Sequence, residues 1–206
     1  MGSKRLPNKN IKIFNGRPLL YWSIVAAKKV KIIDKIYVST DSLKIKKIAV
    51  KYGALVPFLR PKKYAYDNSP SQELIIHLLK NLNYKIDYVV LLQPTSPLRN
   101  YRDIEASLKN CIKKGLKSLV SVTCLSNFKL NLLKKPSKNI KLLDKKQVSK
   151  FKHINGSIFI LKASDFLIKK KIINSSTKFF ETNKNESIDI DTNLDFEFAK
   201  ILSKNR

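Results

Sequence analysis

The chain has 206 residues, 43% of them hydrophobic, which is enough for one substantial core, and we expect a single domain over residues 1–206. Its 42 Lys and Arg residues against 15 Asp and Glu residues give a net charge of +27, which favours anionic partners such as nucleic acid, anionic membranes or polyphosphate compounds. No apolar run approaches the roughly 20 residues that span a bilayer, and no signal-peptide core is present, so we expect a cytoplasmic protein without a membrane partner.

The basic residues do not follow the pattern of a nucleic-acid-binding protein. Only 6 of the 42 are arginine, the residue that makes bidentate contacts to guanine, and the lysines are spread along the chain without interleaved aromatic residues. We interpret most lysines as solvated and expect no nucleic-acid partner, although the charge would still attract an anionic substrate. Cys111 and Cys124 lack the spacing of a zinc site, and we expect them to be buried in a reducing compartment.

Short β-branched runs alternate with stretches of helical period, which indicates a sheet covered by helices. The expected helices are 20–27, 43–52, 70–82, 100–115 and a final one from residue 192. The expected strands are 36–39, 54–59, 88–93, 119–123 and 156–161. The predicted fold class is therefore α/β, with three layers and a mostly parallel sheet. Residues 125–152 stay unassigned, because their Lys-rich and Asn-rich pattern has no clear period.

Capping residues mark the ends of several of these helices. Three pairs have the spacing of a reciprocal N-terminal cap: Ser69 with Gln72, Asn100 with Asp103, and Thr192 with Asp195. Gly53 and Gly115 follow two helices at the position where a left-handed residue commonly ends a helix. The core-facing residues of the Asn100 helix are expected to be Ile104, Leu108, Cys111 and Ile112.

The segment from Leu92 to Arg99 directly follows the most strand-like run, Tyr88–Gln93, which we expect in the middle of the sheet. Open α/β sheets bind ligands at the carboxyl ends of their strands, so this polar, proline-stiffened loop is a candidate ligand site. Gln93 can present both a donor and an acceptor to a ligand. A purely structural loop that leads into a helix cap is the alternative.

The segment from Gly2 to Asn10 is small, polar and basic. Its backbone N–H groups, its hydroxyl and its lysines could hold a triphosphate, although the spacing of a Walker loop is absent. A basic tail would have much the same composition, so these residues alone leave both interpretations open.

Asp189 and Asp191 stand out in a chain so poor in acidic residues. Alternation in an extended segment puts their side chains on one face, about 6 to 7 Å apart along the backbone, so both carboxylates could bind one hard cation. The alternative is that Asp191 caps the last helix and Asp189 is merely solvated.

Together these loops resemble the acylneuraminate cytidylyltransferases, which make CMP-activated sialic acids and related nonulosonates. The likeness covers almost the full length in the expected order. It comprises Gly2–Asn10, Gly16–Leu19, Val38–Asp41, Phe58–Pro61, Leu91–Arg99, Asn155–Gly156 and Ser187–Thr192. The resemblance implies a Rossmann-like nucleotidyltransferase fold. It also implies a magnesium-assisted attack of the sugar's anomeric hydroxyl on the α-phosphate of CTP, which releases pyrophosphate.

The resemblance implies a role for each matching residue. Ser3, Lys4 and Lys9 would hold the phosphates of CTP, with Asn10 nearby, and Arg60 and Ser71 would surround cytosine. The Ser71 loop reads Asp67-Asn68-Ser69-Pro70-Ser71, which departs from the family pattern. Gln93 would face the sugar, and Lys145 and Lys152 stand where the family often has arginines for the sugar carboxylate. Asp189 and Asp191 would bind Mg²⁺ and, with Lys9, form the catalytic set.

Two further expectations follow from the family comparison. The family's first strand and the arginine that follows it would lie before Gly2, where this sequence has only Met1, so we expect the natural chain to begin upstream. Family members are commonly dimers, and residues 125–152 are the expected contact of a homodimer. A degenerate CTP-binding protein, a cytidylyltransferase for the eight-carbon sugar Kdo, and a basic nucleic-acid-binding module remain as alternatives.

Overall fold

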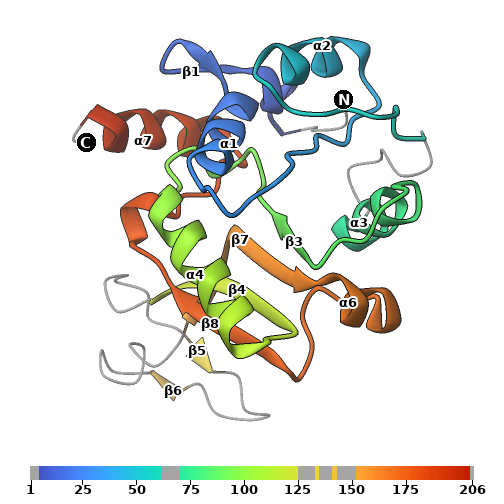
Figure 1. Ribbon diagram of the computed structural model, residues 1–206. Coiled ribbons are helices and arrows are strands. Elements are labelled where there is room, and N and C mark those ends of the chain that lie inside the picture. Colours follow the sequence, from blue (N-terminus) through green and yellow to red (C-terminus); the bar gives the residue numbers. More distant parts are fainter. Residues whose placement is uncertain (1–4, 62–69, 125–132, 135–140, 143–151, 205–206) are drawn as a thin grey trace.

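The computed structural model describes residues 5–61, 70–124, 133–134, 141–142 and 152–204. Figure 1 shows the arrangement of the elements. The α-helices are α1 (Leu19–Lys28), α2 (Leu43–Lys51), α3 (Ser71–Lys80), α4 (Tyr101–Lys114), α6 (Ala163–Lys169) and α7 (Asn193–Lys204). The strands are β1 (Ile13–Phe14), β2 (Arg17–Pro18), β3 (Tyr88–Leu91), β4 (Ser118–Cys124), β5 (Leu133–Lys134), β6 (Lys141–Leu142), β7 (Lys152–Lys162) and β8 (Thr177–Glu181). Two short 3-10 helices are η1 (Lys9–Ile11) and η3 (Lys184–Glu186). None of the helices in the described ranges is long and apolar enough to cross a membrane.

The central sheet has the strand order β3-β7-β4-β8. β7 pairs antiparallel with both β3 and β4, while β4 and β8 pair in parallel, so β3, β4 and β8 all run in one direction. The strand pairs β1–β2 and β5–β6 form separate short antiparallel ladders. The expected α/β class is confirmed, and β7 is the one described strand of the central sheet that runs against the others.

Helices pack on both faces of this sheet, which gives the three expected layers. One buried cluster joins α4 to β4 and β7, and it includes Ile104, Leu108, Cys111, Leu119, Ile158 and Ile160. A second cluster joins Ile75 of α3 and Phe166 of α6 to Leu161 of β7. Ile160 and Leu161 are successive strand residues and therefore point to opposite faces.

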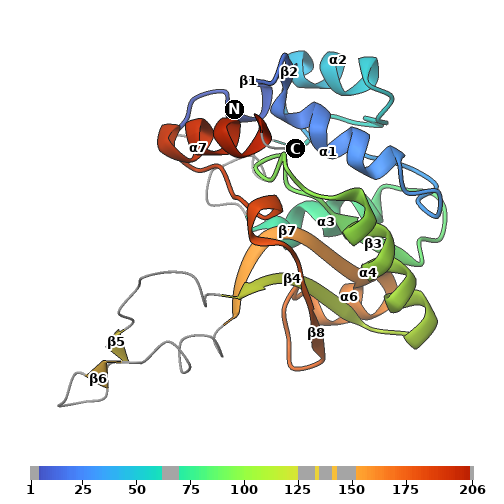
Figure 2. The same cartoon turned by 90° about the vertical axis from the view of Figure 1, so that its left-hand side faces the viewer.

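The first and last parts of the described chain pack together at one end of the molecule, where α1, α2, β1, β2 and α7 gather in both views (Figures 1 and 2). Leu6 and Phe14 form a buried cluster there with Ile190 and Phe196. The aromatic rings of Phe14 and Phe196 meet edge to face at 5.8 Å between centroids. This cluster brings the N-terminal loop next to the acidic segment 187–192.

The predicted boundaries of α4 are confirmed. The Asn100 side chain caps the helix by accepting a hydrogen bond from the Arg102 N–H, and Gly115 ends it in the left-handed conformation at φ 59°. Ile112 was expected to face the core but is 53% exposed. The buried stripe at Ile104, Leu108 and Cys111 lies on one side of the helix, and Ile112 is rotated by about 100° from Cys111.

The strands predicted at 36–39 and 54–59 are wrong as continuous strands. They meet only in one parallel bridge between Tyr37 and Leu55. The Leu55 N–H donates to the Ile36 carbonyl at 2.8 Å, and the Val38 N–H donates to the Leu55 carbonyl at 2.9 Å. β3 also differs from prediction, because it lies at the edge of the central sheet, ends at Leu91 and is only half-buried.

Other elements depart from the sequence pattern in smaller ways. The N-cap position of α3 is Pro70, and no side chain there caps the helix. The predicted cap of Ser69 with Gln72 is not tested, because Ser69 lies outside the described residues. Leu82 lies beyond the end of α3. α6 and β8 were not predicted, while the capping pair of Thr192 and Asp195 at the start of α7 is confirmed. Most of 125–152 lies outside the described residues, apart from β5, β6 and the first residue of β7.

Candidate active site

The N-terminal loop and the acidic segment meet through a direct ion pair. Lys9 Nζ lies 2.9 Å from Asp191 Oδ1, although the residues are 182 positions apart in sequence. Arg5 approaches the other oxygen of the same carboxylate at 3.6 Å. Lys9 belongs to η1, which follows Asn8 in the left-handed conformation. Two predicted site residues that are far apart in the chain are therefore brought together.

Of the three other predicted residues of the N-terminal loop, the structure describes Asn10. Asn10 lies in η1 and is exposed. Ser3 and Lys4 lie outside the described residues, so their predicted phosphate contacts stay predictions.

The acidic segment is fixed by the residue between the two aspartates. Ile190 is fully buried, and its N–H donates to the Thr95 carbonyl at 2.9 Å. Asp189 and Asp191 are both exposed, as expected from alternation in an extended segment. The segment is thus tied to the loop that contains Gln93.

The alternative in which Asp191 caps the last helix is wrong. The reciprocal cap of α7 is formed by Thr192 and Asp195, whose side chains accept from each other's backbone N–H at 3.2 and 2.7 Å. The Asp191 carboxylate points instead to Lys9. It is therefore available for a role outside the helix.

The Asp189 carboxyl has a raised pKa. Although Asp189 keeps exposed surface, neighbouring protein atoms remove part of the hydration of its carboxyl; this is the main cause, and the nearby Asp191 charge adds to it. A hydrogen bond from the Thr95 side chain and the positive charge of Lys9 act in the opposite direction. The two carboxylates therefore repel each other in a way that a bound cation would relieve.

Gln93 and Asp189 converge on Gly156, in the middle of β7. Gly156 has φ +71°, and a Cβ atom added there would lie 3.0 Å from Gln93 Oε1 and 3.7 Å from Asp189 Oδ2. Both side chains thus approach the bare Cα of this glycine. The predicted sugar-facing residue and one predicted metal ligand therefore approach the same position of β7.

Arg99 holds the Gln93 loop against β7 and was not assigned a role from the sequence. It is buried and donates to the Gln93 carbonyl at 2.7 Å, to the Ser157 carbonyl at 2.6 Å and to Ser23 Oγ at 3.0 Å. Burial lowers the pKa of Arg99 to about 9, against the opposing effect of Asp189, so it is still charged at neutral pH. The sequence places Arg99 at the end of the loop but does not reveal these partners.

The predicted cytosine-binding residue Arg60 lies beside residues 39–41. Its N–H donates to the Thr40 carbonyl at 2.7 Å, and its guanidinium approaches Asp41 at 3.9 Å. Burial lowers the pKa of Arg60, and Asp41 partly offsets this. Arg60 Nε and Ser39 Oγ are buried without a hydrogen-bond partner among the described residues. Buried polar atoms without a partner are rare in folded proteins, and a bound group that pairs with them would explain these two.

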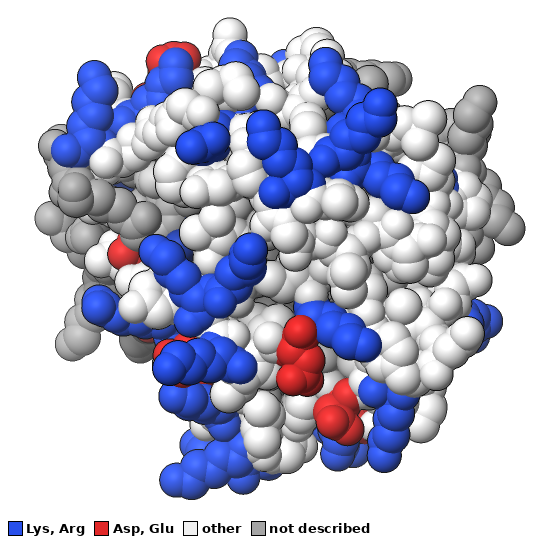
Figure 3. All heavy atoms as spheres, turned by 45° about the horizontal axis from the view of Figure 1, so that its top comes forward, with Lys and Arg blue, Asp and Glu red and all other residues white. Residues whose placement is uncertain are grey.

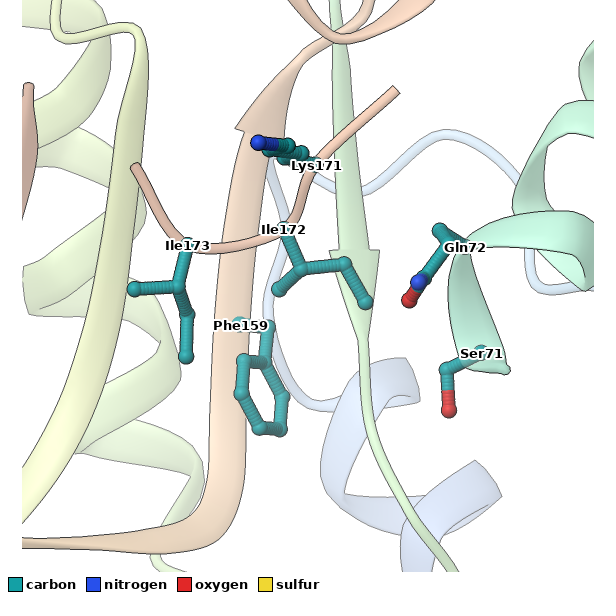
Figure 4. A pocket seen from close by; sticks show the side chains of 6 residues that line it. All are labelled: Ser71, Gln72, Phe159, Lys171, Ile172 and Ile173. Carbon is teal, nitrogen blue, oxygen red and sulfur yellow. The ribbon is translucent and has the colours of Figure 1, made fainter. Parts of the chain in front are cut away.

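Ser71, also predicted near cytosine, lies at the rim of a pocket of about 320 Å³ (Figure 4). The pocket is lined by Ser71, Gln72, Phe159, Lys171, Ile172 and Ile173. Phe159 belongs to β7, three residues after Gly156, so one strand connects the pocket wall to the glycine that Gln93 and Asp189 both approach. No motif in the sequence singles out Phe159 or Ile172.

Of the two lysines predicted to bind the sugar, Lys152 alone lies among the described residues. Lys152, the first residue of β7, is exposed and pairs with Glu181 of β8 at 3.2 Å. Lys145 lies outside the described residues. Their roles stay predictions.

The carboxylates at this site fit a magnesium ion better than a zinc ion. Within the described ranges, no group of three or more His, Cys, Asp or Glu residues could hold a metal by itself. Mg²⁺ is commonly bound by one or two carboxylates together with substrate phosphates and water, and Asp189 and Asp191 supply oxygen ligands of that kind. Because Lys9 lies against Asp191, substrate phosphates bound by Lys9 would lie close to the Asp191 carboxylate.

The face formed by the top of Figure 1 is strongly basic. Figure 3 shows many Lys and Arg side chains there and few acidic ones. A chain of net charge +27 attracts anions, and the field would favour an approaching triphosphate.

The sequence profile of the cytidylyltransferase family matches residues 1–206, the whole chain. The chain therefore belongs to the cytidylyltransferase family. It is 37% identical over 213 residues to the CMP-N,N'-diacetyllegionaminic acid synthase of Legionella pneumophila, with 98% of this chain and 91% of that protein covered. It is 32% identical to a pseudaminic acid cytidylyltransferase of Campylobacter jejuni, with 98% and 92% covered. The N-acylneuraminate cytidylyltransferase of Escherichia coli is 34% identical, and the match spans 96% of this chain and 49% of that protein.

Solved cytidylyltransferase structures share the fold of this family member at low sequence identity. A CMP:2-keto-3-deoxy-manno-octonic acid synthetase has a TM-score of 0.73 at 14% identity, with 99% of this chain and 95% of that chain covered. A 4-diphosphocytidyl-2C-methyl-D-erythritol synthase from Anaerococcus prevotii has a TM-score of 0.71 at 16% identity, with 95% and 93% covered. The Rossmann-like nucleotidyltransferase fold expected from the sequence is thereby confirmed.

Proposed function

We propose that this cytidylyltransferase transfers CMP from CTP to the anomeric hydroxyl of a nonulosonic acid and releases pyrophosphate. The observation that carries the proposal is the contact of Lys9 with Asp191, which unites a basic loop and an acidic pair at one place. The relatives named for legionaminic and pseudaminic acid support a nine-carbon sugar acid as the acceptor.

In this reaction the sugar hydroxyl oxygen forms a bond to the α-phosphorus, and the bond from the α-phosphorus to the bridging oxygen breaks. The hydroxyl proton passes to water, and the β- and γ-phosphates leave with the bridging oxygen as pyrophosphate. Lys9, with Ser3 and Lys4, would neutralise the phosphates, since an ammonium follows phosphate oxygens as their charge redistributes. Asn10 would hold the nucleotide beside them.

Separate residues would hold the nucleotide and the sugar. Arg60 would offer the nucleotide a buried Nε that has no hydrogen-bond partner among the described residues, and Ser71 lines the pocket that contains Phe159. Gln93, beside Gly156, would orient the sugar. The pocket at Phe159 combines apolar and polar walls, which suits a sugar acid that carries acylamido groups.

Asp189 and Asp191 would hold Mg²⁺. The ion would polarise the phosphate and offset the negative charge that builds up on it. The raised pKa of Asp189 supports this assignment, because a bound cation would offset both its loss of hydration and its repulsion by Asp191. Lys145 and Lys152 are the proposed partners of the sugar carboxylate.

Pyrophosphate release tests the proposal directly. The purified protein is given CTP and Mg²⁺ with legionaminic, pseudaminic or N-acetylneuraminic acid, with Kdo as the eight-carbon alternative. We expect release with at least one nonulosonic acid, and Asp191→Asn should lower it by about 100-fold or more. Glu197→Gln is the matched control, because Glu197 is an exposed acid that pairs with Lys200 on α7. CTP binding without turnover on any sugar would favour the degenerate alternative.

Two finer expectations belong to the same proposal. The protein would work as a homodimer in the cytoplasm. Sedimentation of the purified protein tests the first, and a fluorescent fusion in cells tests the second.

A further inference from the structure

β7 contains a large irregularity opposite Ser121. Val120 pairs with Phe159 and Val122 pairs with Ile154, so residues 155–158 bulge out between two regular parts of the ladder. A bulge leaves backbone groups without strand partners. Here side chains satisfy them: the Ile158 N–H donates to Ser121 Oγ at 2.8 Å, and the Ser157 N–H donates to Asn155 Oδ1 at 3.1 Å.

Asn155 is the centre of a buried polar network. Its Oδ1 accepts from Ser121 Oγ at 2.6 Å, and its Nδ2 donates to Thr123 Oγ1 at 2.7 Å and Thr182 Oγ1 at 2.8 Å. Asn155, Ser121, Thr123 and Thr182 are all at most 8% exposed. The amide therefore uses both of its hydrogens and its oxygen inside the protein.

Thr182 extends the network to the acidic segment. Its Oγ1 lies 2.7 Å from Ser187 Oγ, and Ser187 Oγ donates to the Asn183 carbonyl at 2.6 Å. Thr182 Oγ1 also lies 3.4 Å from the Val122 carbonyl, and the 2.7 Å contact holds the hydroxyls of Thr182 and Ser187 together whichever of them donates. Ser187 is buried and stands two residues before Asp189. The backbone around Ser187 is thus fixed by hydrogen bonds that begin in the bulge of β7.

The network runs from Asn155, next to Gly156, to Ser187, two residues before Asp189. At one end Asn155 precedes Gly156, whose Cα faces Gln93 Oε1 and Asp189 Oδ2. At the other end Ser187 leads into Asp189. Buried networks in which every member has its partner hold one arrangement of the elements they join. The network therefore fixes how far Asp189 lies from Gly156 and Gln93.

We propose that Thr182 and Ser187 are positioning residues, which set the Asp189 carboxylate for metal binding through the buried network centred on Asn155. The inference rests on the proposed function for the identity of the metal-dependent reaction. Neither hydroxyl touches a substrate in it. They act only through the path of the chain between β8 and Asp189.

Thr182→Val tests this inference, since it keeps the shape of the side chain and removes its hydroxyl. Thr177→Val is the matched control. Thr177 is the first residue of β8, Thr182 directly follows the strand, and the two are equally buried. Thr177 shares a 2.6 Å hydrogen bond with Ser118, which does not lead to the acidic segment. The main readout is the Kd for Mn²⁺, measured by electron paramagnetic resonance on the protein without sugar. The melting temperature is measured in parallel.

We expect Thr182→Val to weaken Mn²⁺ binding roughly 10-fold or more, as is typical when a group that orients a metal ligand is lost. Thr177→Val should lower the melting temperature with the Kd unchanged, and Thr182→Ser should restore the Kd. If Thr182→Val does not fold, Ser187→Ala is expected to give the same loss. Equal Mn²⁺ affinity in the wild type, Ser187→Ala and any folded Thr182→Val would overturn the inference. Failure of the proposed function would appear separately, as wild-type protein that releases no pyrophosphate with any sugar acid.

Discussion

The Lys9 ammonium donates a 2.9 Å hydrogen bond to the Asp191 carboxylate and so joins the start of the chain to the segment before its last helix. The Lys9 side chain is only 14% exposed, while that of Asp191 is 51% exposed. Lys9 is thus held in place, with its ammonium on the more exposed Asp191 carboxylate. A triphosphate that enters there would meet a positioned ammonium and two carboxylates suited to a cation.

Lys9→Ala should raise KM for CTP and lower kcat, together by about 100-fold in kcat/KM, because one positioned charge on the phosphates is lost. The measurement is steady-state pyrophosphate release. Lys12→Ala is the control, since Lys12 is a neighbouring lysine that contacts Asn193 of α7 at 3.0 Å instead of Asp191. An equal loss in both variants would mean that general charge, and not the position of Lys9, matters.

Gly156→Ala should impair sugar use more than nucleotide use. The added methyl group would lie 3.0 Å from Gln93 Oε1 and force that side chain to shift. We expect kcat/KM for the sugar to fall about 10-fold or more, since small displacements in an active site have large effects on rate. The KM for CTP should change little.

Gly115→Ala separates this effect from backbone strain. Gly115 also has a positive φ, +59°, but a Cβ there would meet nothing within 4 Å. Both variants should lose about 1 to 2 kcal/mol of stability from the left-handed conformation. Only Gly156→Ala should change kinetics, and a Gly115→Ala enzyme with the same kinetic defect would refute the role of Gly156.

Asp189→Asn should stabilise the metal-free protein at neutral pH while it abolishes activity. The pKa of Asp189 is raised mainly by desolvation, so the folded state binds the proton more tightly than the unfolded state does. Ionised Asp189 therefore lowers stability at pH 7, and this penalty disappears as the pH falls through the folded pKa toward the ordinary value of 3.8.

Melting curves in EDTA check the sign of this effect. The melting temperature of Asp189→Asn should exceed that of the wild type at pH 7, and the difference should shrink as the buffer approaches pH 4. A variant that melts below the wild type at pH 7 would show that the Asp189 charge is net stabilising.

Arg99→Lys should destabilise the protein strongly although it keeps the positive charge. Lysine cannot reproduce the planar fork that reaches the Gln93 carbonyl, the Ser157 carbonyl and Ser23 at once. The loss should be about 3 kcal/mol, or roughly 6 to 12 °C in Tm for a chain of this size. Arg102→Lys, at an exposed position on the next turn, is the control and should be nearly neutral.

Local patterns predicted the elements that contain their own signals. α4 has a cap, an apolar stripe and a terminal glycine within a short stretch, and β4 is buried along almost its whole length. β8 carries no such signal, because it is an edge strand in which Thr177 alone is buried and Phe179 is 59% exposed. The strands expected at 36–39 and 54–59 failed for another reason: a strand needs partners that local sequence does not specify.

The same distinction applies to the site. Asp189 and Asp191 could be singled out because acids are scarce in the chain and their alternation around Ile190 is local. The contacts of Arg99 and the network of Asn155 depend on a bulge in β7, which is set by pairing with β4. Ser39 was part of a recognised motif, but only the fold reveals that its hydroxyl is buried without a partner among the described residues.

The measurement that tests the central claim most directly is phosphorus NMR of the purified protein with CTP, Mg²⁺ and a nonulosonic acid. We expect the three CTP resonances to be replaced by that of pyrophosphate and that of a phosphodiester between CMP and the sugar. The diester should be absent with Asp191→Asn at the same protein concentration. Unchanged CTP with every nonulosonic acid, or pyrophosphate accompanied by free CMP and no diester, would contradict CMP transfer to the sugar.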